Sequence, residues 1–116
     1  MATKKTPSVF TQIIERKIPA NIRYEDDEFI AIDDIHPQAP VHILLIPKEP
    51  ITTLEHVEMS DGHFHKALLQ TARRVAKLAG IEKNYRLMMN VGTEVQMVHH
   101  IHLHILGGWQ KPSPEI

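Results

Sequence analysis

Hydrophobic residues recur with helical spacing in two segments of the chain. The first segment, residues 8–17, has Ser8 where a helix N-cap is expected, and it places on one helical face the apolar side chains Val9, Phe10, Ile13 and Ile14. The second segment covers residues 60–79, and Gly80 follows it as a stop signal. The pattern therefore predicts a short helix near the N-terminus and a long helix in the middle of the chain.

The other hydrophobic segments are typical of β-strands. Residues 21–33 predict two short strands around an acidic turn at Asp26 and Asp27. Residues 41–48 predict a strand that Pro47 ends, and two further strands are predicted at 85–92 and 99–108. Strands joined by short turns, together with two helices, predict an α+β fold with a five-stranded antiparallel sheet.

The last predicted strand carries three histidines at alternating positions, His100, His102 and His104. Successive side chains of a strand point to opposite faces, so these imidazoles are expected to share one face. The residues between them, Ile101, Leu103 and Ile105, are expected to share the other face. We expect the apolar face to pack under the helices and the histidine face to be open.

Three explanations of the histidine row are compatible with the residues themselves. A zinc ion needs ligand nitrogens about 2.0–2.1 Å away, whereas the outer two histidines of a regular strand lie about 13 Å apart. A metal site would therefore need a ligand from elsewhere, such as His42 or Asp34. The second explanation is that the histidines form the solvated face of a half-exposed strand. The third is a catalytic site, because an imidazole with a pKa of about 6.5 can be a nucleophile, base or acid near neutral pH.

Composition limits the other possibilities. A chain of 116 residues is expected to be one domain, which we place at residues 8–111 between frayed tails at 1–7 and 112–116. It has no cysteine, no secretory signal and no apolar run of about 20 residues, so we expect a soluble cytoplasmic protein. The 13 Lys and Arg residues are dispersed and nearly balance 14 Asp and Glu residues, which argues against nucleic-acid and membrane partners.

Two motifs together resemble a known family. Residues 100–106 read His-Ile-His-Leu-His-Ile-Leu, and residues 33–48 read Asp-Asp-Ile-His-Pro-Gln-Ala-Pro-Val-His-Ile-Leu-Leu-Ile-Pro-Lys. With the segments 86–92 and 104–110, they are similar to the histidine triad (HIT) superfamily, in particular its Hint branch of nucleotide-binding proteins. The resemblance covers about residues 8–111. It implies a HIT-like fold, a sheet continued across a homodimer, and cleavage of purine nucleoside 5′-phosphoramidates to the nucleoside monophosphate and an amine, without a metal or cofactor.

The resemblance also implies roles for individual residues. His102 would be the nucleophile that forms a nucleotidyl-histidine, and His104 would contact the phosphate oxygens and the leaving group. The carbonyl of His100 would fix the tautomer of His102, and His42 would support the triad from the neighbouring strand. Asp34 would hold the ribose hydroxyls, since a carboxylate accepts two hydrogen bonds.

Other residues are expected to line the nucleotide site. The resemblance implies an apolar base slot and polar or loop contacts nearer the phosphate, from Phe10, Ile13, Ile35, Asn90, Gln96 and Met97. Phe10 and Ile13 are at helical spacing and are equally compatible with a purely structural core role. Asp34 is likewise compatible with a turn role before the prolines. The remaining histidines, at 36, 56, 63 and 65, are expected at the surface.

The loop before the triad departs from the family pattern. Val95, Gln96 and Met97 stand where Hint proteins typically carry Gly-Gln-Ser. Val95 restricts the backbone, and Met97 cannot donate a hydrogen bond as serine does. We therefore expect slow to moderate turnover. The alternatives are a purine nucleotide-binding or signalling protein with little turnover, a dinucleoside polyphosphate hydrolase, which Gln96 keeps open, and a zinc-binding module.

Overall fold

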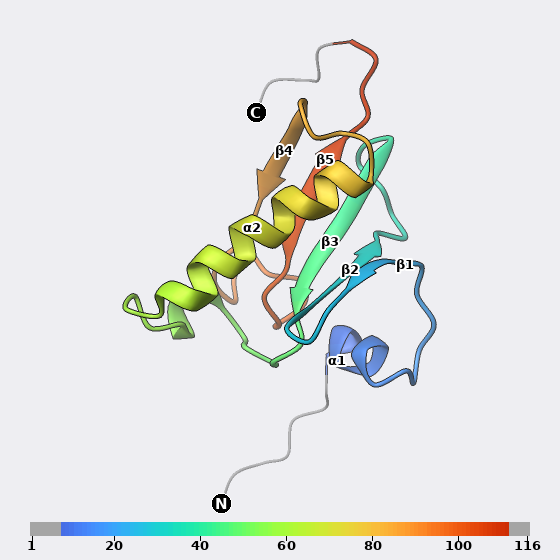
Figure 1. The fold of residues 1–116 in the computed structure, drawn as a ribbon. Helices are drawn as coiled ribbons and strands as arrows, with labels where there is room; N and C mark the ends of the chain where they lie inside the picture. Colours follow the sequence, from blue (N-terminus) through green and yellow to red (C-terminus); the bar gives the residue numbers. More distant parts are fainter. Residues whose placement is uncertain (1–7, 112–116) are drawn as a thin grey trace, which may run out of the picture.

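The computed structural model describes residues 8–111, so the tails expected at 1–7 and 112–116 lie outside the described residues. The described part has five strands in one antiparallel sheet, ordered β1-β2-β3-β5-β4 (Figure 1). This confirms the predicted α+β fold. The elements in chain order are α1 (Val9–Ile14), β1 (Ile22–Glu25), β2 (Phe29–Asp33), β3 (Val41–Pro47), a 3-10 turn (Leu54–His56), α2 (Gly62–Leu78), β4 (Tyr85–Met88) and β5 (Leu103–Gly107).

Local capping explains where the helices begin and end. The Ser8 hydroxyl accepts a hydrogen bond from the backbone N–H of Thr11 at 3.1 Å, as expected for the N-cap of α1. Helix α2 starts later than predicted because Asp61 is its N-cap, and this carboxylate accepts from the N–H of Phe64 at 2.9 Å. Gly80 follows α2 with a φ of 76°, a conformation that favours glycine.

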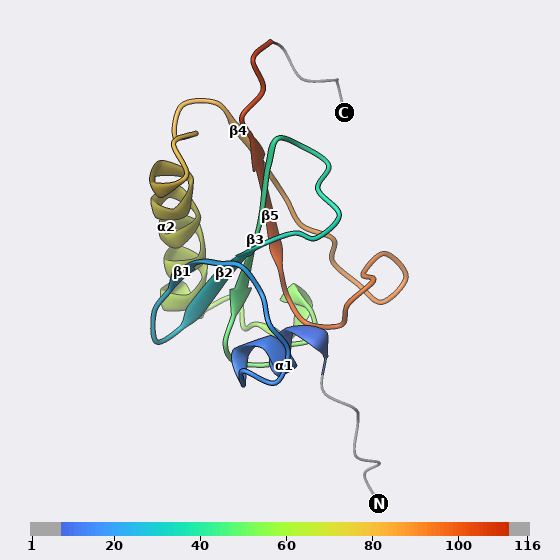
Figure 2. The same cartoon turned by 90° about the vertical axis from the view of Figure 1, so that its right-hand side faces the viewer.

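The two helices lie on opposite faces of the sheet, which corrects the expectation that both cover the face of Ile101. Figure 2 shows the sheet close to edge-on, with α2 on one side and the loop before β5 on the other. The core beneath α2 contains Phe29, Ala31, Ile43, Leu45, Phe64, Leu68, Ala72, Val75, Ala76, Ile81, Ile101, Leu103 and Ile105. The core beneath α1, on the histidine face, contains Phe10, Ile13, Ile30, Ile32, Leu44 and Ile46.

The last two strands are shorter than predicted. Strand β4 ends at Met88, and β5 begins at Leu103 rather than at residue 99. Before β5 the chain bonds outside the sheet, since the N–H of Ile101 donates to the carbonyl of Ile51 at 2.8 Å. The alternation of faces nevertheless continues back to Ile101, which packs beneath α2 with the alternate residues of β5. His99 is exposed and lies outside the strand.

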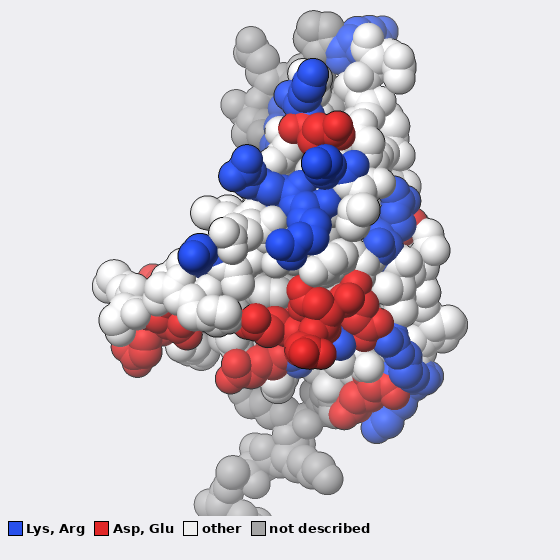
Figure 3. All heavy atoms as spheres, viewed as in Figure 1, with Lys and Arg blue, Asp and Glu red and all other residues white. Residues whose placement is uncertain are grey.

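Charged side chains are grouped on the face that α2 covers. Figure 3 shows most of the visible Lys and Arg side chains over its upper half, around one acidic group, and most of the Asp and Glu side chains over its lower half, with further basic side chains at the lower right. Arg73, Arg74 and Lys77 line one surface hollow together with Tyr85 and the acidic Glu82. No helix within residues 8–111 is long and apolar enough to cross a membrane.

Candidate active site

A pocket of about 570 Å³ opens on the sheet face that α1 partly covers. Its apolar end is formed by α1, the segment after it and the facing strand residues, among them Phe10, Ile13, Ile18, Pro19, Ile32 and Leu44. Its polar end is formed by Asp34, His42, Asn90, His102 and His104. An apolar cavity with a few convergent polar groups is typical of a small-molecule site.

His102 is held in one tautomer by the backbone. Its Nδ1 lies 2.8 Å from the carbonyl oxygen of His100. A carbonyl can only accept, so Nδ1 carries the proton and Nε2 keeps its lone pair. The edge of the Phe10 ring packs on the imidazole, with 5.0 Å between centroids. The geometry therefore presents a buried imidazole in the pocket whose Nε2 has no proton in the neutral ring.

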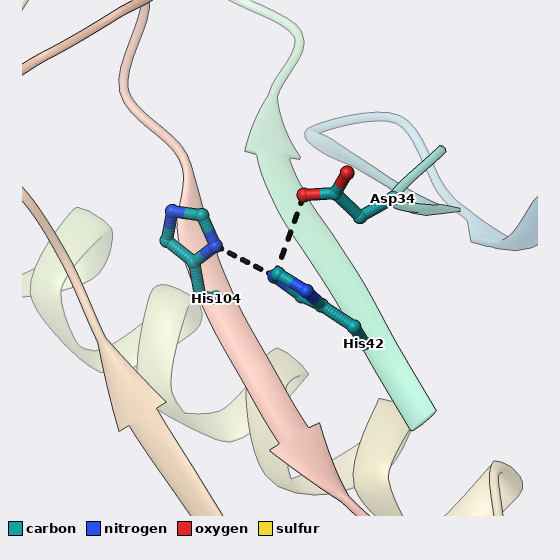
Figure 4. A group of neighbouring side chains, drawn as sticks. All are labelled: Asp34, His42 and His104. Atoms are coloured by element: carbon teal, nitrogen blue, oxygen red, sulfur yellow. Dashed lines mark hydrogen bonds and ion pairs between the residues drawn. The ribbon is translucent and has the colours of Figure 1, made fainter. Parts of the chain in front are cut away.

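His42 and His104 form a second oriented pair, with Asp34 beside them (Figure 4). The backbone N–H of Gln38 donates to Nδ1 of His42 at 3.0 Å, so the proton of a neutral His42 is on Nε2. That Nε2–H donates to Nδ1 of His104 at 2.8 Å and lies 3.4 Å from the Asp34 carboxylate. His104 is then left with its proton on Nε2, as a hydrogen-bond donor.

Burial favours the neutral form of three imidazoles, those of His104, His42 and His100. It lowers the pKa of His104 to about 4, and repulsion from His102 and His42 adds to the effect. Burial also lowers the pKa of His42, although the nearby Asp34 carboxylate opposes the shift. The pKa of His100 is lowered by burial as well, against the opposing effect of its bond to the Pro47 carbonyl. A neutral His104 donates one hydrogen bond without adding a positive charge.

The predicted site residues lie in three kinds of position. Phe10 and Ile13 are 5% and 7% exposed, so they belong to the core and also line the pocket. Ile35 and Met97 line it from the rim, with 86% and 95% exposure. Asp34 lines the pocket and also has a turn role, because its second oxygen accepts from the N–H of His36 at 2.8 Å.

Two predicted residues do not line the pocket. Gln96 is buried, and its amide is bonded to the backbone of Gly92, Thr52 and Val98, so it supports the loop, and its predicted contact with the nucleotide stays a prediction. The His100 ring is 1% exposed, so the expectation of an open histidine face is wrong there. Its backbone carbonyl contacts the next triad histidine, His102.

Sequence reasoning missed several pocket residues. Val9, Ile18, Pro19 and Val98 line the apolar end, and no periodicity marked the segment after α1 as part of a site. His36, predicted as a surface residue, is exposed and lines the rim. The backbone of Gln38 was also missed, although the stiff turn at 37–40 was the available signal for an ordered N–H there.

One group of side chains in the pocket has the chemistry of a metal site. Ligand atoms of Asp34, His42 and His104 lie within 4.8 Å of one another among the described residues. Only one triad histidine belongs to this group, in agreement with the distance argument against three triad ligands on one ion. Two imidazoles and a carboxylate are a donor set that zinc accepts.

A five-stranded antiparallel sheet whose central strands bring several histidines into one pocket is the architecture that the histidine triad resemblance implies. The sequence model of the HIT domain matches residues 15–111. The chain belongs to the HIT domain family.

Individual relatives cover nearly all of the chain. Adenylylsulfatase HINT1 of Arabidopsis thaliana is 42% identical over 112 residues, which are 94% of this chain and 76% of that protein. The 14 kDa zinc-binding protein of Zea mays is 43% identical over 112 residues, which are 94% of this chain and 88% of that protein. The solved HIT family hydrolase of Clostridium thermocellum superposes with a TM-score of 0.85 at 42% identity, and the match covers 97% of this chain and 99% of that one.

Proposed function

We propose that the protein is a nucleotidyl hydrolase that cleaves purine nucleoside 5′-phosphoramidates to the nucleoside monophosphate and an amine. The observation that carries the proposal is the 2.8 Å contact between Nδ1 of His102 and the His100 carbonyl, which leaves Nε2 as a nucleophile in the pocket. The names of two similar proteins, a HIT family hydrolase and an adenylylsulfatase, support hydrolysis.

The proposed reaction has two steps. Nε2 of His102 attacks the α-phosphorus, the P–N bond breaks, and the departing nitrogen keeps the bonding pair and takes a proton from water. Water then attacks the phosphorus, the bond to Nε2 breaks, and the second step releases the proton that the first consumed. The His100 carbonyl stabilises the positive charge that develops on the His102 ring, and Nε2–H of His104 donates to the phosphoryl group or the leaving nitrogen.

The pocket suggests how the nucleotide lies. The Asp34 carboxylate lines the pocket and would accept hydrogen bonds from the ribose hydroxyls. The base occupies the apolar end between Phe10 and Ile13, with Ile35 at the rim. Asn90 and Met97 lie beside the phosphate.

The test uses adenosine 5′-phosphoramidate as substrate, with and without chelator, and measures release of AMP. An early quench followed by mass spectrometry is expected to find an adenylate on His102. His102→Ala is expected to lower kcat by at least 10³-fold, in line with loss of a catalytic nucleophile. Retention of activity in His102→Ala would refute the mechanism. Adenosine 5′-phosphosulfate is the second substrate arm, because a similar protein is named an adenylylsulfatase.

Metal binding is the second candidate function, and the group of Asp34, His42 and His104 favours it. A similar protein is named a zinc-binding protein. Zinc on these ligands would replace the hydrogen bond from Nε2–H of His42 to Nδ1 of His104, which orients His104 for the hydrolase. Activity lost to chelator and restored by Zn²⁺ would favour the metal, whereas inhibition by Zn²⁺ favours the hydrolase. Tight AMP binding without turnover, with or without metal, would point to a nucleotide-binding protein.

We also propose that the protein is a homodimer with a continuous sheet. Strand β4 is an edge strand, and its Leu87 and Met88 are 37% and 40% exposed. An exposed edge with apolar side chains favours pairing with another strand. The other edge strand, β1, is interrupted by a register shift between Ile22 and Tyr24, which makes it the poorer partner. Light scattering is expected to give twice the mass of the 13.3 kDa chain.

A further inference from the structure

His100 connects three separate parts of the molecule through its buried ring. Its Nε2 lies 2.8 Å from the carbonyl oxygen of Pro47 at the end of β3, so Nε2 carries the proton. Its Nδ1 must then accept, and the nearest donor is the hydroxyl of Ser8 at 3.0 Å. The Thr11 hydroxyl is also in range, at 3.4 Å. All of the ring's hydrogen-bonding capacity is therefore used.

Ser8 is at the same time the N-cap of α1. Its oxygen accepts from the N–H of Thr11 at 3.1 Å, and its single hydrogen has two acceptors in range, Nδ1 of His100 at 3.0 Å and the Thr11 hydroxyl at 3.3 Å, of which the His100 nitrogen is the nearer. Helix α1 is only six residues long, and too short to be stable without its tertiary contacts. Phe10 on this helix packs edge-on against both His100 and His102, with centroids 6.0 Å and 5.0 Å apart. The position of α1 thus depends on contacts with the triad.

We infer that Ser8 is a positioning residue that couples the wall of the pocket formed by α1 to the orientation of His102. The coupling runs from Ser8 through the His100 ring to the His100 carbonyl, which holds Nδ1 of His102. It rests on the proposed function for its effect on catalysis. The coupling joins residues 92 positions apart in sequence, and the capping role of Ser8 by itself does not require it.

Two losses are expected when the hydroxyls at Ser8 and Thr11 are removed together. Nδ1 of His100 is left buried without a donor, so the ring and the carbonyl that follows it are less well fixed, and kcat falls. Helix α1 is released from the triad, so KM for a nucleoside substrate rises. We expect each parameter to change about tenfold in Ser8→Ala/Thr11→Val, as for the loss of one buried hydrogen bond.

Matched variants separate this role from capping. Ser8→Thr keeps the hydroxyl and is expected to retain wild-type kinetics. Ser8→Gly keeps most of the capping free energy, because glycine at an N-cap costs only a few tenths of a kcal/mol relative to serine. It nevertheless lacks the donor, so in the Thr11→Val background it is expected to show the same kinetic losses as Ser8→Ala. A pure capping role predicts instead that Ser8→Gly in the Thr11→Val background has nearly the same kinetics as Thr11→Val alone.

Two readouts do not depend on turnover. Histidine-selective ¹⁵N NMR is expected to show a shifted Nδ1 resonance for His100 in Ser8→Ala/Thr11→Val and an unshifted one in Ser8→Thr. Binding of AMP is expected to weaken about tenfold in the double variant, whereas binding of ribose 5-phosphate, which lacks the base, changes less than twofold.

The outcomes distinguish the two proposals. If wild-type protein fails to hydrolyse the phosphoramidate, the proposed function fails, and the NMR and binding measurements still decide the role of Ser8. If the wild type is active and the double variant keeps its kcat, its KM and its His100 resonances, the coupling is refuted.

Discussion

Replacing Gln96 by alanine distinguishes a ligand contact from a structural support. The side chain is 6% exposed and its amide makes three hydrogen bonds. Its Oε1 accepts from the N–H of Gly92 at 2.8 Å, and its Nε2 donates to the carbonyls of Thr52 and Val98 at 2.9 and 3.2 Å. At about 1 kcal/mol for each bond, Gln96→Ala is expected to lower the free energy of unfolding by about 3 kcal/mol.

The assay is urea denaturation at one fixed protein concentration, followed by far-UV circular dichroism. Gln70→Ala is the matched control, because Gln70 is exposed on α2 and its loss is expected to leave stability nearly unchanged. Gln96→Glu provides a second comparison. At neutral pH its carboxylate places an acceptor against two carbonyls, so the loss is at least as large as for alanine. Protonation restores a donor, and part of the stability is expected to return at lower pH.

The loop also contributes Val98 and Met97 to the pocket, so weaker nucleotide binding is expected to accompany the lost stability. A Gln96→Ala variant with unchanged stability and weakened AMP binding would refute this reasoning. It would show that Gln96 acts on the ligand, as the family resemblance had implied.

Further predictions concern packing and pH. A Cβ at Gly107 would lie 2.8 Å from Cδ1 of Ile81 and 3.1 Å from the carbonyl oxygen of Asn84, so Gly107→Ala is expected to destabilise the protein by about 1–3 kcal/mol, measured as a lower Tm. The pKa of His104, about 4, lies below its unfolded value, so the unfolded state binds more protons between pH 6.5 and pH 4. The contribution of His104 to the free energy of unfolding is therefore fully present above pH 6.5, and it is lost as the pH is lowered from 6.5 to 4. His104 contributes at most about 3 kcal/mol to this loss. Urea denaturation at pH 7 and pH 5 should show a smaller loss in His104→Gln than in the wild type, and equal losses would contradict the assignment.

The element types were predictable because they depend on short-range periodicity. The alternation at Ile101, Leu103 and Ile105 assigned these residues to one face correctly, even where regular strand structure was absent. The placement of α1 was predicted wrongly, although a signal was present. Residues 29–32 and 43–46 are continuous apolar runs rather than alternating ones, which is typical of strands covered on both faces.

The site was predictable where a motif carries its own geometry, and less so where distant segments meet. The contact of His102 with the His100 carbonyl involves neighbours in the chain and agrees with the expectation from the resemblance. The contact of Ser8 with His100 joins the two ends of the domain, and nothing in the sequence pattern marks it. The inward direction of Gln96 depends on its rotamer and on three backbone partners, so residue type alone could not distinguish a support from a ligand contact.

Of the two unusual residues before the triad, Met97 lines the pocket, at its rim, and Val95 does not line it. Val95 and Met97 are 55% and 95% exposed, while Gln96 between them is turned into the loop. The orientation of His102 comes from the His100 carbonyl, and that of His104 comes from His42 on β3. Neither bond involves the loop side chains. The substitutions at 95 and 97 are therefore expected to act on substrate binding and leaving-group preference, because the groups proposed to perform the chemical step are held by the sheet and by α1.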